Sequence, residues 1–152
     1  MNYWLMKSEP DVFGIDDLEN APGMTEPWDG VRNYQARNMM RDDMKNSDLA
    51  FLYHSNCKEP GIAGIMEIVR EGYPDSSAFD PDAKYFDPKS KPENPRWYRV
   101  DVRYVRKLKR IITLSELKGH SEVADLPLVK RGNRLSIMPV SRQQWEYILA
   151  LE

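Results

Sequence analysis

The stretch that decides the fold class is Trp97-Tyr98-Arg99-Val100-Asp101-Val102-Arg103-Tyr104-Val105. Its even-numbered positions are aromatic or β-branched, and the charged residues Arg99, Asp101 and Arg103 lie between them. Alternation with a period of two is typical of a strand that has one face against the core and the other in solvent. We therefore expect this stretch to belong to an antiparallel sheet.

Further apolar runs of strand length lie on both sides of this stretch. The expected strands cover residues 2–8, 49–54, 62–69, 97–105 and 135–138. Pro10 and Pro139 end the first and last of them, because proline cannot continue the hydrogen-bond ladder. Gly64, inside the third strand, indicates a bulge or a close backbone approach.

Helices are predicted by their capping signals. Asn33 is the expected N-cap of a helix over residues 33–44, and the capping-box patterns at 113–116 and 141–144 each open another. Residues 72–95 read as a long loop, rich in proline and aspartate. Because the strands do not alternate regularly with crossover helices, the pattern favours an α+β fold with a mostly antiparallel, barrel-like sheet.

Composition limits the class of protein. The chain has 152 residues, 41% of them hydrophobic and 30% charged, which fits one globular domain over residues 1–152. No apolar run approaches the roughly 20 residues that span a bilayer, so we expect no membrane partner. A lone cysteine, Cys57, excludes an internal disulfide framework and fits a reducing compartment, so we expect a cytoplasmic protein. The sequence does not determine the oligomeric state, for which a monomer is the default expectation.

Net charge gives no overall attraction to nucleic acid, since it is −2 with a pI near 5.8. The cations are nevertheless concentrated in two segments, residues 96–110 and 130–142. These segments form either a local basic face or an ordinary solvated surface.

Three short clusters of polar and aromatic residues stand where apolar elements begin or end. They are residues 4–10 (Trp-Leu-Met-Lys-Ser-Glu-Pro), 28–34 (Trp-Asp-Gly-Val-Arg-Asn-Tyr) and 51–55 (Phe-Leu-Tyr-His-Ser). Folds tend to place binding groups at such positions. Flat aromatic surface, several donors and a carboxylate suit a planar ligand with polar edges, such as a nucleobase.

These clusters also carry a family resemblance. Together with Gly61-Ile62-Ala63-Gly64-Ile65, Tyr85-Phe86-Asp87, Pro95-Arg96-Trp97 and Arg134-Leu135-Ser136, they resemble the EVE domain family nearly end to end. The resemblance implies a PUA-like fold, a small β-barrel of mostly antiparallel strands with flanking helices. It also implies binding of nucleic acid that carries modified bases, in DNA or RNA, by enclosing a flipped-out base, with modified cytosine in DNA as the leading candidate.

Base capture needs flat walls and a few groups that read the base edge. The candidate site residues are Lys7, Ser8, Glu9, Trp28, Val31, Arg32, Asn33, His54, Ser55, Trp97, Arg134 and Leu135. Trp28 and Trp97 are the expected walls. Ser8 and Glu9 are expected to read the base edge, with Glu9 accepting from an exocyclic amine.

The other candidates are expected to hold the nucleotide from outside. Arg32 and Asn33 open a helix whose N-terminus favours phosphate. His54 is a possible donor to a phosphate or a base edge, and Leu135 a possible apolar lid. Each candidate also has a structural alternative, such as Trp28 packed beneath its loop, Asn33 acting only as a cap, or His54 holding the fold.

The sequence leaves other function classes open. An enzyme that uses His54 with Cys57, or Glu9 as an acid or base, lacks a second group at a known catalytic spacing. A protein-interaction module that uses residues 72–95, and an RNA-binding module for tRNA or rRNA, are further alternatives. Two histidines and one cysteine do not form a usual zinc site, so we expect no metal and no cofactor.

Overall fold

A computed structural model describes all residues from 1 to 152. Six strands form one sheet in the order β2-β5-β4-β3-β1-β6. The strands are β1 (Tyr3–Ser8), β2 (Thr25–Pro27), β3 (Leu49–His54), β4 (Gly61–Pro74), β5 (Tyr98–Thr113) and β6 (Ile137–Val140). Only the β1–β3 pair is parallel, and the other four pairings are antiparallel. The predicted α+β fold with a mostly antiparallel sheet is therefore confirmed.

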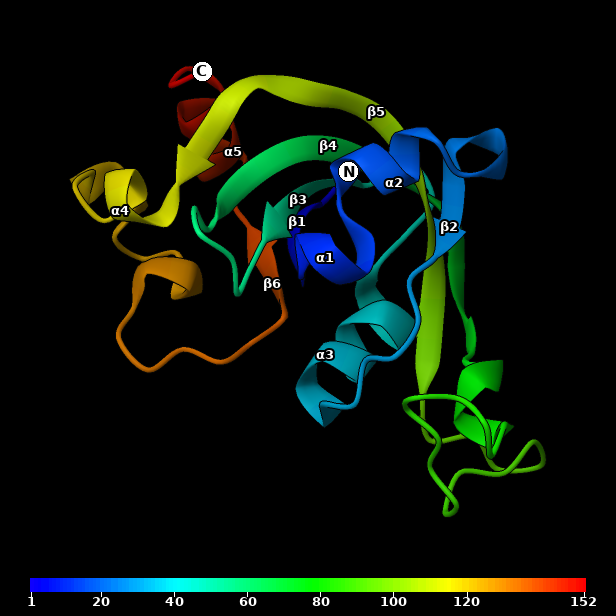
Figure 1. The fold of residues 1–152 in the computed structure, drawn as a ribbon. Coiled ribbons are helices and arrows are strands. Elements are labelled where there is room, and N and C mark those ends of the chain that lie inside the picture. The colour runs from blue at the N-terminus through cyan, green and yellow to red at the C-terminus, as the bar shows by residue number, and fades with distance from the viewer.

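The predicted barrel is not confirmed. The sheet ends at β2 on one side and at β6 on the other, and these two strands do not pair with each other. The two longest strands, β4 and β5, curve over the rest of the molecule, so the sheet is strongly bent without being closed (Figure 1).

Short helices complete the fold. They are α1 (Pro10–Phe13), α2 (Ile15–Glu19), α3 (Tyr34–Asn38), α4 (Leu114–Leu117) and α5 (Arg142–Leu149), with a π-helical turn, η2 (Met39–Asp43), after α3 and 3₁₀ turns at Pro22–Met24, Ser76–Phe79, Ser121–Val123 and Pro127–Val129. Three predicted caps are confirmed: the side chains of Asn33, Thr113 and Ser141 each accept a hydrogen bond from the first turn of their helix. None of the helices is long and apolar enough to cross a membrane.

Two hydrophobic cores cover the two faces of the sheet, and β1 contributes to both. Trp4 and Met6 belong to the first core, whereas Leu5 between them belongs to the second. This follows from the alternation of side chains along a strand. In the second core, Trp145 of α5 stacks on Phe51 with a ring distance of 3.9 Å. A strand buried on both faces keeps its end in a fixed position, and the candidate site is built at that end.

The strands β4 and β5 run further than the sequence pattern predicts. The pairing of β4 with β5 shifts register between Ile62 and Gly64 and again between Ile65 and Met66. Such bulges turn side chains to the other face, so the period of two is lost after Val105 although the strand continues to Thr113. Gly64 is required here, because an added Cβ would lie 2.5 Å from Ile15 Cδ1 and 2.9 Å from the carbonyl oxygen of Arg106.

Candidate nucleic-acid interface

A pocket of about 550 Å³ opens beside the C-terminal end of β1. We name it the β1 pocket. Its lining consists of Lys7, Ser8, Glu9, Val12, Phe13, Glu26, Pro27, Trp28, Asp29, Gly30, Val31, Arg32, Ser55, Tyr85, Arg134 and Ser136. Eight of the twelve residues predicted from the sequence belong to this lining; Asn33, His54, Trp97 and Leu135 do not.

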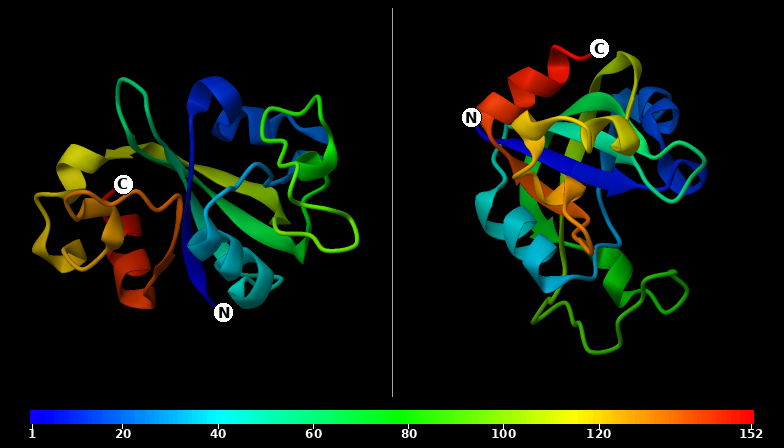
Figure 2. Two further views of the ribbon diagram at one scale, coloured as in Figure 1. Left: turned by 90° about the horizontal axis from the view of Figure 1, so that it is seen from below. Right: turned by 90° about the vertical axis from the view of Figure 1, so that its left-hand side faces the viewer.

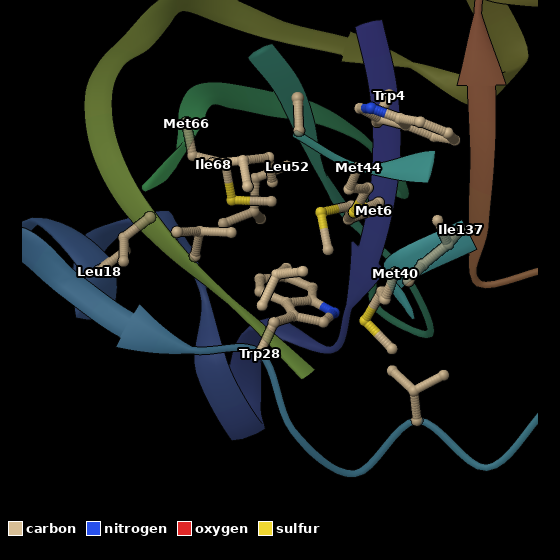
Figure 3. Close-up of a cluster of buried hydrophobic side chains, with 14 of the residues drawn as sticks. Trp4, Met6, Leu18, Trp28, Met40, Met44, Leu52, Met66, Ile68 and Ile137 are labelled. Carbon is tan, nitrogen blue, oxygen red and sulfur yellow. The ribbon is translucent and has the colours of Figure 1, made fainter. Parts of the chain in front are cut away.

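Trp28 lines the pocket and is also part of the first core. Its backbone N–H donates to the carbonyl oxygen of Val100 at 2.7 Å, which continues the β2–β5 pairing by one residue. The residue is only 8% exposed, and its indole faces the core methionines Met6 and Met40 (Figure 3). The structural alternative, Trp28 packed beneath its loop, is therefore correct, and the residue lines the pocket as well.

Tyr85 supplies a second flat wall of the pocket, although it was not among the site residues predicted from the sequence. Its ring lies directly on Gly30, where an added Cβ would come within 2.7 Å of Tyr85 Cδ2. Gly30 has φ of +77°, a left-handed conformation that side chains other than glycine rarely adopt. Tyr85 is 43% exposed, so much of its surface is available to a ligand. The available signal was the motif Tyr85-Phe86-Asp87 in the family resemblance.

A buried ion pair fixes this wall in place. Asp75 has a fully buried side chain that accepts hydrogen bonds from the backbone N–H of Gly30 at 2.9 Å and from Arg32 Nη1 at 3.0 Å. Burial acts to raise the pKa of Asp75, but hydrogen bonds from Ser77, Gly30 and Arg32 outweigh it and hold that pKa below its usual value. The carboxylate therefore stays charged and ties residues 30–32 to the start of the 75–97 loop.

Arg32 uses its donors for hydrogen bonds within the protein, which leaves few of them for a phosphate. Besides Asp75, its Nε donates to the carbonyl oxygen of Tyr85 at 2.9 Å and its Nη1 to that of Val31 at 3.0 Å. With these donors engaged, Arg32 orients the Tyr85 wall. The helix N-terminus next to it is closed by Asn33, whose Oδ1 accepts from the N–H of Ala36 at 3.0 Å. The predicted role of Asn33 as the N-cap of α3 is therefore confirmed.

Trp97 is not a wall of the β1 pocket. It is 6% exposed, stacks on Tyr34 with ring centroids 4.8 Å apart, and donates from Nε1 to Asp87 Oδ2 at 2.7 Å. These contacts anchor the far end of the 75–97 loop, which projects from the sheet (Figure 1). Trp97 therefore acts on the pocket only through the loop that carries Tyr85.

His54 and Leu135 also lie outside the lining. The His54 Nε2 atom accepts a hydrogen bond from the N–H of Ile15 at 3.2 Å, at the start of α2. Burial lowers the pKa of His54, which favours the neutral ring that this acceptor role requires. Leu135 packs against the second core instead of covering the pocket. The side chain of His54 therefore holds α2 in place, as its structural alternative predicted.

The polar residues at the end of β1 are partly engaged with each other. Ser8 Oγ donates to the carbonyl oxygen of Phe13 at 2.6 Å, and the backbone N–H of Ser55 donates to the carbonyl oxygen of Ser8 at 3.0 Å. Glu9 Oε1 accepts from Asn56 Nδ2 at 2.7 Å. Ser8, Glu9 and Ser55 line the pocket, and their side-chain oxygens have acceptor lone pairs that these hydrogen bonds leave unused, so they remain suited to a ligand that donates.

The charges in the lining are divided between two groups. Lys7 and Arg134 form no ion pair. The acids Glu26 and Asp29 were not among the predicted site residues. Burial raises the pKa of both carboxyl groups. The nearby charge of Asp29 raises the pKa of Glu26 further, and the nearby charge of Asp75 raises the pKa of Asp29 further. The pocket thus contains unpaired cations together with carboxylates whose charged form a ligand donor would stabilise.

Most cations of residues 96–110 are neutralised by ion pairs, so this segment does not form a free basic face. Arg103 pairs with Glu67, Arg106 with Glu152, Lys107 with Asp16 and Glu19, and Arg110 with Glu116. The cations of the 130–134 segment and Lys7 have no such partners. No group of three or more His, Cys, Asp or Glu side chains is arranged to hold a metal ion.

Comparison with known proteins places the chain in a family. The EVE domain model matches residues 2–151. The chain belongs to the EVE domain family. Thymocyte nuclear protein 1 of Danio rerio is 48% identical over 166 residues, which cover 98% of this chain and 71% of the relative. The human protein of the same name is 46% identical over 168 residues, covering 99% of this chain and 74% of the relative.

Solved structures agree with this assignment. The protein PSPTO5229 from Pseudomonas syringae has a TM-score of 0.94 at 52% identity, with 98% of each chain covered. Human THYN1, solved in complex with 5-methylcytosine containing DNA, has a TM-score of 0.91 at 47% identity, with 99% of this chain and 97% of that chain covered. An ASCH protein from Zymomonas mobilis, at 9% identity and a TM-score of 0.58, shares the fold alone.

Proposed function

We propose that this protein is a non-catalytic DNA-binding EVE domain that encloses a flipped modified cytosine in the β1 pocket. The observation that carries the proposal is the complex of human THYN1 with 5-methylcytosine containing DNA, because that chain is 47% identical over 99% of this one. Residues 1–152 would act as one domain, with nucleic acid as the partner. RNA that carries modified bases is the alternative carrier.

The lining of the β1 pocket fits a cytosine. Trp28 and Tyr85 supply flat surfaces, and an aromatic face can stack any base. Glu26, Asp29 and Glu9 supply carboxylates, which are the usual acceptors for the exocyclic N4 amine of cytosine. Val12 and Val31 supply apolar surface for a 5-methyl group. A volume of about 550 Å³ lies in the usual range for pockets that enclose small ligands.

Magnitudes indicate which contacts decide the affinity. Stacking contributes roughly 1–3 kcal/mol per base, and extruding the base from a duplex costs a few kcal/mol. These two terms nearly cancel. Net affinity must therefore come from contacts to the phosphates, which Lys7 and Arg134 are free to make at the pocket edge.

The arrangement around His54 supports binding without catalysis. The Cys57 Sγ atom is 3.8 Å from the backbone oxygen of His54, and the His54 Nε2 atom is engaged with the backbone of Ile15. A nucleophile activated by a histidine needs the two side chains within hydrogen-bond reach of each other. A cytoplasmic location is still a prediction, which a fluorescent fusion would test.

The test is a binding assay with matched oligonucleotides. We would measure dissociation constants for DNA and RNA of one sequence, each with cytosine or 5-methylcytosine at the central position, as single strands and as duplexes. Tighter binding of the modified DNA supports the proposal. Equal binding of all oligonucleotides, or none at all, overturns it.

A matched variant locates the site. Asp29→Asn removes one carboxylate of the pocket, and Asp43→Asn removes a carboxylate near the opposite end of β1. The first is expected to weaken binding of the modified DNA and the second to leave it unchanged. If Asp29→Asn binds the modified DNA with unchanged affinity, the Asp29 carboxylate does not contact the base.

A further inference from the structure

A second hollow of about 760 Å³ lies on the other side of β1. We name it the lysine groove. Its cations are Lys7, Lys118, Lys130 and Arg131, and its lining contains no aspartate or glutamate. None of these four cations forms an ion pair, in contrast to most of the basic residues of β5. Four unpaired cations around one hollow favour an anionic occupant.

The groove has an apolar floor beneath this basic rim. Tyr53 of β3, Leu117 of α4 and Leu128 form part of the floor. Asn133 also belongs to the lining, and its buried Nδ2 atom has no hydrogen-bond partner in the protein. A buried donor without an acceptor is costly, and a rotation of the Asn133 side chain toward the groove would let a ligand oxygen satisfy it. Apolar floor, free donor and cationic rim together suit a nucleotide better than a bare anion.

The groove and the β1 pocket share one lining residue. Lys7 lines both hollows, and its Nζ atom lies 5.8 Å from the ring centre of Tyr53, on the groove side. Asn133 of the groove and Arg134 of the pocket are neighbours in the chain. In Figure 2 (left), β1 runs between the green 75–97 loop, which carries Tyr85, and the yellow-to-orange segment that follows α4. A strand that leaves the pocket past Lys7 would therefore enter the groove.

We propose that the lysine groove binds the nucleotide and phosphates next to the captured base, on one side of it only. This inference rests on the proposed function, because it takes the captured base as the starting point. The groove lies on one side of β1, so the protein would read a strand with a fixed polarity. Lys7 would contact the phosphate between the two subsites.

The experiment combines strand extensions with a charge variant of the full chain. Short single strands carry 5-methylcytosine at the 5′ end, at the 3′ end or in the centre. One variant is Lys130→Gln with Arg131→Gln, both exposed residues of the groove. The control is Lys45→Gln with Arg142→Gln, which makes the same charge change in a hollow at the opposite end of β1. Urea unfolding midpoints verify that both variants are folded.

The expected result has two parts. For the wild-type protein, extending the strand on one side of the modified base tightens binding, and extending it on the other side does not. In the groove variant this gain disappears, and the slope of log K against log salt becomes shallower by about 1.4, since each of two lost phosphate contacts contributes roughly 0.7 on a single strand. The control variant keeps the gain and the slope.

The two proposals fail in different ways. A wild-type protein that prefers modified DNA but gains equally from extension on both sides, or a groove variant that keeps the wild-type slope, overturns the groove proposal alone. A wild-type protein with no preference for modified DNA overturns the proposed function, and the groove proposal with it.

Discussion

Replacement of Tyr85 by alanine tests whether this exposed wall of the β1 pocket is a binding surface. Tyr85 lies on Gly30 and is 43% exposed, so its removal leaves no cavity in the core. The lost stacking is worth roughly 1–3 kcal/mol. This corresponds to a dissociation constant for modified DNA that rises by about 5- to 150-fold. The free energy of unfolding should change by less than about 1 kcal/mol.

Two further variants make this result specific. Phe86→Ala is the matched control, because Phe86 is 38% exposed in the same loop but does not line the β1 pocket. It should bind modified DNA as the wild-type protein does. Tyr85→Phe keeps the ring and should retain most of the affinity. Fluorescence anisotropy gives the dissociation constants, and urea unfolding gives the stability.

Trp28→Ala is expected to behave in the opposite way with respect to stability. Trp28 is 8% exposed and packs in the first core, so its truncation should cost about 3–5 kcal/mol of unfolding free energy. For a domain of this size that is a fall in Tm on the order of 10 °C. If Tyr85→Ala binds normally, or if Trp28→Ala leaves the Tm unchanged, the division between an exposed wall and a core wall is refuted.

Further predictions concern the groups that hold the pocket. The Asp75→Asn variant should be less stable than the wild-type protein above about pH 4, because the lowered pKa of Asp75 stabilises the fold above its unfolded pKa of 3.8. That difference should shrink as pH falls through the native pKa, and a constant difference in urea unfolding would contradict it. NMR titration of His54 should give a midpoint below 6.5, and a midpoint above it would contradict the neutral acceptor role. Cys57→Ser should leave DNA binding unchanged, whereas lost binding would restore a role for the thiol.

The sequence was sufficient for the regular elements whose signals are local. The strand predicted over 49–54 matches β3, and the caps at Asn33 and Ser141 are where their patterns place them. The three-residue strand β2 was not predicted, because Thr25–Pro27 contains a proline and gains its place only by pairing with Val102 and its neighbours. The barrel was not confirmed because closure depends on pairing of the sheet edges, which no local pattern encodes.

The same division applies to the site. Residues at the end of β1, such as Ser8, were predicted because a strand end is visible in the sequence. Tyr85 and Asp75 were not, because their roles come from contacts with Gly30 and Arg32, more than 40 residues away in the chain. His54 and Trp97 have the residue types of a binding site, yet hydrogen bonds to Ile15 and Asp87 engage them in holding the fold.

The contacts of the β1 pocket also determine which feature of the base it distinguishes best. Burying one methyl group contributes only about 0.8 kcal/mol, roughly a fourfold preference for 5-methylcytosine over cytosine. Exchanging the N4 amine for a carbonyl oxygen would leave acceptors such as Asp29 without a donor, which costs roughly 1–3 kcal/mol. Because the Asp29 side chain is 52% exposed, the lower end of this range applies, which corresponds to a preference of about fivefold. Under the groove proposal, phosphate contacts would add affinity equally for every base. If the proposed function is correct, we therefore expect this domain to distinguish cytosine from thymine about as well as it distinguishes methylated from unmethylated cytosine.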